Sequence, residues 1–428
     1  MSKRRKKKLR IGFKVLFIFF LLTIIGFGLR NNFNPTKADT SVDIVNKNSN
    51  KENKQKPEGP KEEIYKVSLF ATGDGLIHNS LAAFAKQSDG SYDFNKYLTE
   101  IKEITKNYDI VYYNQETPFG TNESEYSYYP NFSVPREYGD AMVDAGFNLV
   151  SLASNHSYDK GEKGVLRSLE YWKTKDGIMY NGMASSEEER NNYQIGTKNN
   201  ITYAMLSYTY GLNAESRVNE LKRNNKEYLV NVFDKEKAKK DIEALRDKVD
   251  ILIVAMHWGV EYQLNPNNIQ KEQAKFLADL GVDIIIGNHP HCIQPIEWID
   301  DTLVIYSLGN FISNQGILSL GTYGYGGIVK GTIGAYVTLD ITKTIKVDKT
   351  EEITKNNLKV DLLYTYKNSK QKTYQVLPFS KFSPEYLKNY PKADSNYSYP
   401  TDYHSIYNSY SNVIKKLNSN ITVLPVAD

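Results

Sequence analysis

Short apolar runs of strand length alternate along this chain with stretches of helical spacing, and this alternation restricts the possible fold more than any other feature. The runs are Val67–Ala71, Ile110–Tyr113, Leu149–Ala153, Ile201–Ser207, Ile251–Met256, Ile284–Ile286 and Leu303–Leu308. The helical stretches are Glu137–Ala145, Gly161–Lys173, Lys235–Lys248 and Ile269–Leu280. Strands that alternate with helices indicate an α/β core, in which ligands bind beyond the carboxyl ends of the strands.

Residues that can bind metal follow these apolar runs. Five of the six histidines lie in such loops, namely His78, His156, His257, His289 and His291. Similar positions are held by Asp74, Glu116 and Asn155. Imidazole, carboxylate and amide oxygen together form the donor set of Zn, Mn or Fe. The pattern therefore predicts a metal site built from several strand ends, with Glu116 or Asp74 able to bridge two ions.

Taken alone, each of these residues has a simpler interpretation. Asp74 fits an ordinary turn, Asn155 fits a helix cap, and His257 fits a buried imidazole that only packs. His289 and His291 are alternate residues around a proline, so their side chains are expected to point the same way. The prediction of a metal site depends on all of these motifs occurring in one α/β pattern.

Other residues near the motifs have less defined roles. His78 lies four residues after Asp74, a spacing of one helix turn, so it supports the site, faces a substrate or packs. Cys292 is the only cysteine, which excludes an intramolecular disulfide, and we expect a buried thiol rather than a ligand or nucleophile. His404 is expected on the surface. The stretch Gly321–Gly327, with two tyrosines, either closes over a substrate or is a surface loop.

The N-terminus has the composition of a membrane anchor. Residues 1–10 are strongly basic and are expected in the cytoplasm, and residues 11–30 are apolar enough for one transmembrane signal anchor. A cleaved signal peptide is the alternative, because Thr36-Lys37-Ala38 loosely resembles a cleavage site. Residues 31–63 are polar and predict a disordered linker. Because the basic tail stays in the cytoplasm, the main domain after the linker is expected outside the cell.

The overall charge argues against a nucleic-acid partner. Residues 1–30 carry nine positive charges and no acid, and subtracting them from the formal net charge of +4 leaves about −5 for residues 31–428. A mildly acidic exported part is not typical of nucleic-acid binding. For the remaining chain we predict a main domain over residues 64–345 and a C-terminal accessory region over residues 346–428, with strand-like pieces at Val360–Tyr366 and Thr373–Leu377 and a helix near Ser405–Leu417.

An ordered set of motifs resembles the CapA family of poly-γ-glutamate capsule synthesis proteins from residue 66 to about residue 313–340. The motifs are Gly73-Asp74, Asn114-x-Glu116-x-Pro118, Asn155-His156-x-x-Asp159-x-Gly161, His257-Trp-Gly-x-Glu261-Tyr262, Gly287-x-His289-Pro-His291 and Tyr306-Ser-Leu-Gly-Asn310-Phe. The resemblance implies a metallophosphoesterase-like four-layer αββα sandwich, here with a C-terminal appendage and one N-terminal transmembrane helix.

The same resemblance implies roles for single residues. Asp74 and His291 would hold one metal ion, and Asn155, His257 and His289 the other. Glu116 would bridge the ions, and His156 would face the substrate as a proton donor or phosphate contact. The residues expected to support the ligands or contact substrate are Asn114, Asp159, Glu261, Tyr262 and Asn310.

Two departures from the metallophosphoesterase pattern affect the first metal position. Leu76 stands where a histidine is usual, and Glu116 stands where the bridging residue is usually aspartate. We therefore expect two divalent ions (Mn, Zn or Fe), or one if the first position is empty.

Two functions are compatible with this site. One is a membrane-anchored, extracytoplasmic metal-dependent hydrolase that acts on poly-γ-glutamate or a similar anionic surface polymer. The other is a non-catalytic subunit that binds and exports the polymer beside membrane synthase subunits. A surface nuclease of the same fold is disfavoured, because nothing basic surrounds the motifs.

Overall fold

The computed structural model describes residues 61–315, 317–319, 328–391 and 403–427, which belong to one compact unit, Gly59–Asp428. The expected basic tail and membrane anchor (residues 1–30), the linker up to residue 60 and the loop Gly321–Gly327 lie outside the described residues. Within the described ranges, no helix combines the length and apolar character that a membrane crossing requires.

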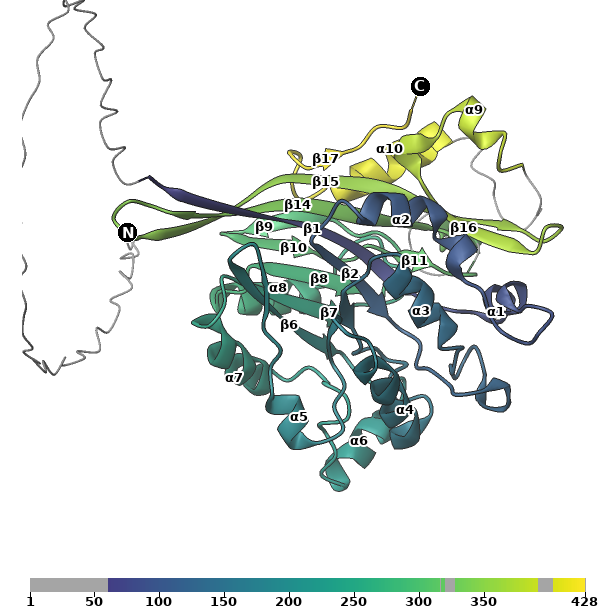
Figure 1. Cartoon of the computed structure of the whole chain (residues 1–428), viewed down its shortest axis with the longest axis horizontal. Helices are drawn as coiled ribbons and strands as arrows, with labels where there is room; N and C mark the ends of the chain where they lie inside the picture. Colours follow the sequence, from purple (N-terminus) through teal and green to yellow (C-terminus); the bar gives the residue numbers. More distant parts are fainter. Residues whose placement is uncertain (1–60, 316, 320–327, 392–402, 428) are drawn as a thin grey trace, which may run out of the picture. The chain divides into compact units, whose positions relative to one another are not determined.

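Two large β-sheets form the centre of this unit (Figure 1). The first contains β1 (Glu63–Gly75), β2 (Ile110–Gln115), β3 (Leu149–Ser151), β4 (Met179–Asn181), β11 (Asn310–Ile312), β14 (Ile333–Ile345), β15 (Glu351–Asn368), β16 (Thr373–Pro378) and β17 (Thr422–Val423). Its order is β16-β15-β14-β1-β2-β3-β4, with β11 beside β1 and β17 beside β15.

The second sheet is smaller. It contains β5 (Gly196–Lys198), β6 (Ile201–Thr209), β7 (Ile251–His257), β8 (Ile284–Asn288), β9 (Ile296–Ile299) and β10 (Thr302–Ile305), in the order β5-β6-β7-β8-β10-β9. A separate pair is formed by β12 (Ile317–Ser319) and β13 (Ile328–Lys330). The central strands of each sheet are parallel, β1 to β4 in the first and β6, β7, β8 and β10 in the second. The carboxyl ends of the parallel strands therefore lie at one edge of each sheet.

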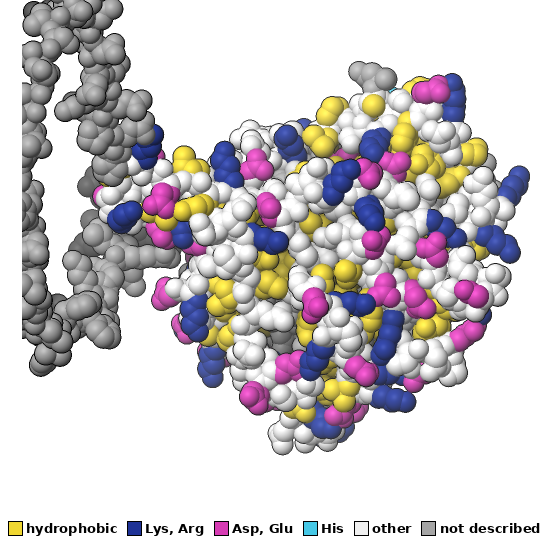
Figure 2. Space-filling model, viewed as in Figure 1, with side chains coloured by type: hydrophobic (Ala, Val, Ile, Leu, Met, Phe, Trp, Pro, Cys, Tyr) yellow, Lys and Arg dark blue, Asp and Glu magenta, His cyan; other side chains and the backbone are white. Residues whose placement is uncertain are grey.

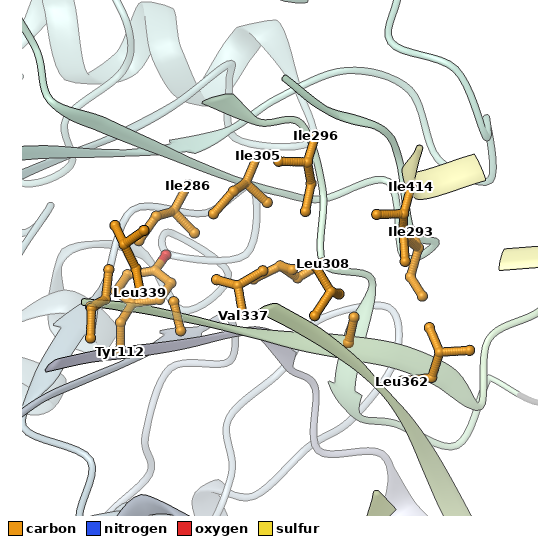
Figure 3. Packing of buried hydrophobic residues seen from close by; sticks show 14 of the residues in the cluster. Tyr112, Ile286, Ile293, Ile296, Ile305, Leu308, Val337, Leu339, Leu362 and Ile414 are labelled. Carbon is orange, nitrogen blue, oxygen red and sulfur yellow. The ribbon is translucent and has the colours of Figure 1, made fainter. Parts of the chain in front are cut away.

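The sheets pack face to face through a buried apolar core (Figure 3). Along β1, Val67, Leu69 and Ala71 point into this core, whereas Phe70 points to the opposite face. This alternation is what a strand produces when both of its faces are covered. Fully burying one such aliphatic side chain contributes about 1.5–3 kcal/mol, so the inner core is a major source of stability.

Helices cover the outer face of each sheet. Apolar side chains of α1 (Asn79–Ala85), α2 (Thr99–Thr105), α3 (Glu137–Asp144) and α4 (Gly161–Lys173) pack on the first sheet, and those of α7 (Lys235–Arg246) and α8 (Asn268–Asp279) pack on the second. The other helices are α5 (Glu187–Asn191), α6 (Glu215–Arg223), α9 (Pro384–Leu387) and α10 (Tyr403–Ile414). Short 3₁₀ turns occur at Asn95–Tyr97, Glu123–Glu125 and Phe379–Lys381. The layers run helix, sheet, sheet, helix, and the predicted α/β class is confirmed.

The expected division at residue 345 differs from the structure. Residue 345 ends β14, and β15 returns beside it as the next strand of the first sheet. The side chains of Ile406, Tyr410 and Ile414 on α10 join the inner core, and Figure 1 shows this helix next to β15. Residues after 345 thus extend the main sheet, because the apolar side chains of β15 are buried in the same inner core as those of β1.

Local signals place most of the central elements where the pattern predicts them. The helix Gly161–Lys173 is α4 without change, and α8 begins with a capping box in which Asn267 and Gln270 exchange hydrogen bonds. It ends before Gly281, whose φ of 86° is a left-handed conformation that suits glycine.

On the face shown in Figure 2, Lys and Arg side chains are interspersed with Asp and Glu.

A buried acid on β15 predicts a pH-dependent stability. Asp361 is 0% exposed, accepts hydrogen bonds from the amide of Ser380 and the hydroxyl of Tyr336, and has its pKa raised to about 6 by burial. The unfolded chain therefore ionises Asp361 first, and stability is lost as the pH rises from about 4 to about 6. Asp361→Asn should remove this loss and be more stable at pH 7 by up to roughly 3 kcal/mol.

Thermal unfolding of both proteins between pH 4 and pH 7.5 measures the effect as a difference in Tm. Asp247→Asn, at an exposed aspartate that follows α7, is the matched control and should track the wild type. A constant Tm difference between Asp361→Asn and wild type over this range would contradict the prediction.

Candidate metal centre

The candidate residues lie where the carboxyl ends of the two sheets meet. Asp74 is near the end of β1 and His257 ends β7, whereas Glu116 directly follows β2 and His289 directly follows β8. The amide of His289 donates a 3.1 Å hydrogen bond to Oδ2 of Asp74, which joins the two sheets at this point. All of these side chains are buried.

Two glycines of the motifs allow the backbone to pack closely behind the site. A Cβ on Gly73 would lie 1.9 Å from the carbonyl oxygen of Gly309, and a Cβ on Gly287 would lie 1.9 Å from that of Tyr306. No side chain fits at either position without moving the backbone. These motif glycines therefore set the distance between strands and leave the ligand side chains in register.

Glu116 lies at the centre of the cluster. Its Oε1 is 3.7 Å from Nε2 of His257 and 3.6 Å from Nε2 of His291. Both carboxylate oxygens are buried, and neither has a hydrogen-bond partner in the described part of the chain. A buried carboxylate without partners is costly, and a cation is the group that would satisfy it. Its position between two histidines is the one that a bridging ligand requires.

One group of ligand atoms surrounds Asp74. Atoms of Asp74, Glu116 and His291 all lie within 4.8 Å of one another. Nδ2 of Asn114 donates to Oδ1 of Asp74 at 2.9 Å, and Nδ1 of His291 lies 3.0 Å from Oδ1 of Asn310. Contacts of this kind orient metal ligands, and the second one leaves Nε2 of His291 facing Glu116.

A second group lies on the other side of Glu116. Ligand atoms of Glu116, His257 and His289 also lie within 4.8 Å of one another. Nε2 of His257 is 2.8 Å from Oδ1 of Asn155, which brings the amide into this group. Nδ1 of His289 is buried without a hydrogen-bond partner among the described residues. The donor types and the unpaired atoms fit a divalent ion at this position.

The pKa values of the clustered acids and histidines are those expected of a site that binds a cation. Burial raises the pKa of Glu116 well above its usual range, with the charge of Asp74 adding to the effect. Burial would lower the pKa of His291, but Glu116 and Asp74 raise it to about 10. Burial and neighbouring imidazoles lower the pKa of His257 and His289. These two imidazoles are thus neutral, as metal binding requires.

His156 lies beside the cluster and is held in a fixed orientation. Its Nδ1 is 2.7 Å from Oδ2 of Asp159. That carboxylate also accepts from the amide of Phe132 at 2.8 Å and from Arg217 at 2.9 Å. Nδ1 of His156 is therefore engaged, and Nε2 is the nitrogen available for chemistry. The side chain of His156 keeps 10% of its surface exposed.

The remaining predicted residues fall into different places. Glu261 forms a third group with His289 and His291, again with ligand atoms within 4.8 Å. The amide of Tyr262 donates to the carbonyl of Pro290 at 2.7 Å. Tyr262 thus fastens the loop after β7 to the loop after β8.

Other residues stay outside the cluster. His78 directly precedes α1 without a side-chain capping bond and belongs to none of the ligand groups found in the described chain, and burial lowers its pKa to about 4. Leu76 is buried in the apolar layer under the helices. Cys292 is a buried thiol, as expected, whose pKa is raised by burial. His404 is exposed, also as expected.

The sequence pattern did not reveal the contribution of the loop after β6. There Oδ1 of Asn213 accepts from Nδ2 of Asn155 at 2.8 Å, and the ring of Tyr210 lies 4.6 Å from that of His289. Arg217 supports Asp159 from the same segment. This loop contains no histidine or carboxylate, so its position after a parallel strand was the only available signal.

The fold and the cluster define an α/β protein with a candidate divalent-metal centre between two sheets. Residues 68–315 match the family described as bacterial capsule synthesis protein PGA_cap. That range is more than half of the chain, and the chain belongs to this family.

Two curated relatives are named CapA, and their names also refer to PGA or capsule biosynthesis. The PGA biosynthesis protein CapA of Bacillus subtilis (strain 168) is 30% identical over 268 residues, which cover 61% of this chain and 68% of that protein. The capsule biosynthesis protein CapA of Bacillus anthracis is 28% identical over 260 residues, covering 59% of this chain and 61% of that protein. The chain thus spans about two thirds of the relatives that it matches.

Among solved structures, a putative 5'-nucleotidase from Staphylococcus aureus aligns with 12% identity and a TM-score of 0.39, covering 81% of this chain and 58% of that chain. A hypothetical protein from Thermus thermophilus aligns with 14% identity and a TM-score of 0.38, covering 68% of this chain and 98% of that chain. Similarity at this level is too distant to support a conclusion.

Glu116→Gln should have opposite consequences with and without metal. Without metal, the variant removes a buried unpaired carboxylate, so its Tm should equal or exceed that of the wild type. With Mn²⁺ or Zn²⁺ at 100 times the dissociation constant, the wild type should gain about 2.7 kcal/mol of stability, and the variant should lose most of this gain.

Differential scanning fluorimetry of the full-length protein in detergent, with EDTA or with added metal, measures both effects. Glu243→Gln, at an exposed position of α7, removes the same charge and should behave as the wild type. An equal metal-induced rise in Tm for Glu116→Gln and wild type would show that Glu116 is not a ligand.

Proposed function

We propose that this chain is a membrane-anchored, extracytoplasmic metal-dependent hydrolase that acts on an anionic cell-surface polymer during capsule or poly-γ-glutamate synthesis or processing. The observation that carries the proposal is the carboxylate of Glu116, which is buried, has no hydrogen-bond partner in the described chain and lies between His257 and His291. A protein that only bound a polymer at its surface would have no need of such a group.

The chain provides separate positions for two ions. Asp74 and His291 would hold one, His257, His289 and Asn155 the other, and Glu116 would contact both. When bound, divalent ions supply a water nucleophile that ionises near neutral pH and positive charge that stabilises an anionic transition state.

His156 is placed to donate a proton to the leaving group. Asp159 engages Nδ1 at 2.7 Å, which fixes the orientation of the imidazole and leaves Nε2 for the substrate. Nε2 can then donate a proton to the departing atom, a role that general acids fill with rate gains of about 10²–10⁴. Arg217 forms an ion pair with Asp159, which holds the carboxylate that orients His156.

The choice of polymer follows from the relatives, whose names refer to poly-γ-glutamate and to capsule biosynthesis. The cleaved bond would be the amide of that polymer or a phosphoester of a similar one. The membrane anchor expected at residues 11–30 would place the enzyme beside membrane synthase subunits, its proposed partners. Nucleic acid is not proposed as a substrate, because residues 31–428 are mildly acidic.

A non-catalytic role in polymer binding and export is the second candidate. Leu76 favours it, because this buried apolar residue offers no donor where metallophosphoesterases usually have a histidine. A single retained ion would then bind the carboxylates of the polymer and would not need His156.

Substitution of His156 separates the two roles. With full-length protein in detergent and Mn²⁺ or Zn²⁺, His156→Ala should lower kcat by about 10²–10⁴ while the metal content stays the same. The substrates are bis(p-nitrophenyl) phosphate and poly-γ-glutamate, and the readouts are nitrophenol release and polymer length. His404→Ala, at an exposed histidine, is the matched control and should keep full activity.

Turnover of only one substrate would identify the bond. Metal-loaded wild type that binds poly-γ-glutamate but turns over neither substrate would favour the export role. Turnover that is unchanged in both His156→Ala and Glu116→Gln would show that this centre is not the active site.

A further inference from the structure

We propose that Glu261 is a metal ligand and that its carboxylate replaces the histidine missing at Leu76. The inference rests on the metal centre of the proposed function and adds a residue that the usual metallophosphoesterase pattern does not include. It assigns a donor to the ion position that is otherwise one ligand short.

The shortage is visible in the first group of ligands. Asp74, Glu116 and His291 supply three side chains. The side chain of Leu76 is 2% exposed and packs with the apolar layer under the helices, while its amide donates to the carbonyl of Ile312 at 3.0 Å. No donor can come from this position without repacking that layer.

The carboxylate of Glu261 lies within reach of the centre. Its ligand atom and those of His289 and His291 are all within 4.8 Å of one another. Two ligands bound to one ion at about 2.1 Å are separated by roughly 3–4.2 Å, so small side-chain adjustments bring Glu261 into the coordination sphere. His291 belongs both to this group and to the group of Asp74 and Glu116, so Glu261 lies on the side of the first ion position.

The backbone around Glu261 is built to hold this position. Trp258 donates from its amide to the carbonyl of Asn288 at 3.1 Å, and Tyr262 donates from its amide to that of Pro290 at 2.7 Å. These bonds fasten the Glu261 loop to the His289–His291 loop at two points. Tyr262 adopts a φ of 64°, a conformation that costs free energy for a non-glycine residue and that these contacts maintain.

A neighbouring hydroxyl completes the arrangement. The phenol of Tyr262 lies beside Glu261, whose charge adds to the rise that burial causes in the pKa of Tyr262, and its hydroxyl accepts a 3.4 Å hydrogen bond from Gln315. Carboxylates that bind metals are themselves usually hydrogen-bonded by such outer groups. Glu261 therefore has a donor atom near the ion position and a neighbouring phenol that is placed to orient it.

The experiment measures metal binding rather than activity. Full-length wild type, Glu261→Gln, Glu116→Gln and Glu243→Gln are purified in detergent, titrated with Mn²⁺ or Zn²⁺ by calorimetry, and assayed for bound metal after dialysis. Glu261→Gln should bind one of two ions more weakly by over 100-fold, whereas loss of an outer partner costs only about 10–100-fold. Glu243→Gln, at an exposed site of α7, should match wild type.

The Co²⁺-substituted protein provides a second readout. Removal of a ligand should change the visible absorption bands of the ion, whereas removal of an outer hydrogen bond should leave the band intensities nearly unchanged. Circular dichroism of each variant confirms that it is folded.

The outcomes separate this inference from the proposed function. Wild-type affinity and an unchanged Co²⁺ spectrum in Glu261→Gln, with weakened binding in Glu116→Gln, would overturn only the role of Glu261. Wild-type binding in both variants would overturn the metal centre as well. Weakened binding in both, with loss of one ion in Glu261→Gln, is the expected result.

Discussion

The carboxylate of Asp74 connects the two sheets, and the geometry of the centre depends on this connection. It accepts a hydrogen bond from Asn114 of the first sheet and another from the amide of His289, which follows the second sheet. The inner apolar core holds the sheets at a fixed separation, but it does not select a register at their ends. The hydrogen bonds to Asp74 do, and they place Glu116 opposite His257 and His291.

This register concentrates ionisable groups in a largely buried place. Three acids and three histidines form overlapping groups of three, and in each group the ligand atoms lie within 4.8 Å of one another. Burial raises the pKa of Glu116, and the carboxylates beside His291 raise the pKa of that imidazole. Such a cluster weakens the apolar core that surrounds it, a cost that natural proteins accept at functional sites. Metal binding would offset this cost, because bound cations would take the place of protons on the carboxylates and imidazoles of the cluster.

The sequence predicted the parts of this site that depend on strand ends. Asp74, Glu116, His257 and His289 follow apolar runs, and parallel strands bring such positions to one edge. It did not predict the parts that depend on contacts between loops. The pairing of β14 with β15 joins segments of different composition, so the chain pattern indicated a boundary where the sheet continues. Asn213 contacts Asn155 from a turn with a φ of 62°. Asparagine favours this conformation, but nothing in the local sequence shows which residue it would meet.

The donor chemistry of the two ion positions differs once Glu261 is included. The position near Asp74 would have three carboxylates and one imidazole, whereas the position near His257 would have two imidazoles, an amide oxygen and the shared carboxylate of Glu116. Oxygen-rich sets suit Mn²⁺, and imidazole-rich sets suit Zn²⁺ or Fe²⁺. Replacing a neutral histidine by an anionic glutamate also lowers the net positive charge at the first position. That position then attracts an anionic polymer less strongly, so the second ion and His156 carry more of the charge stabilisation at the reacting bond.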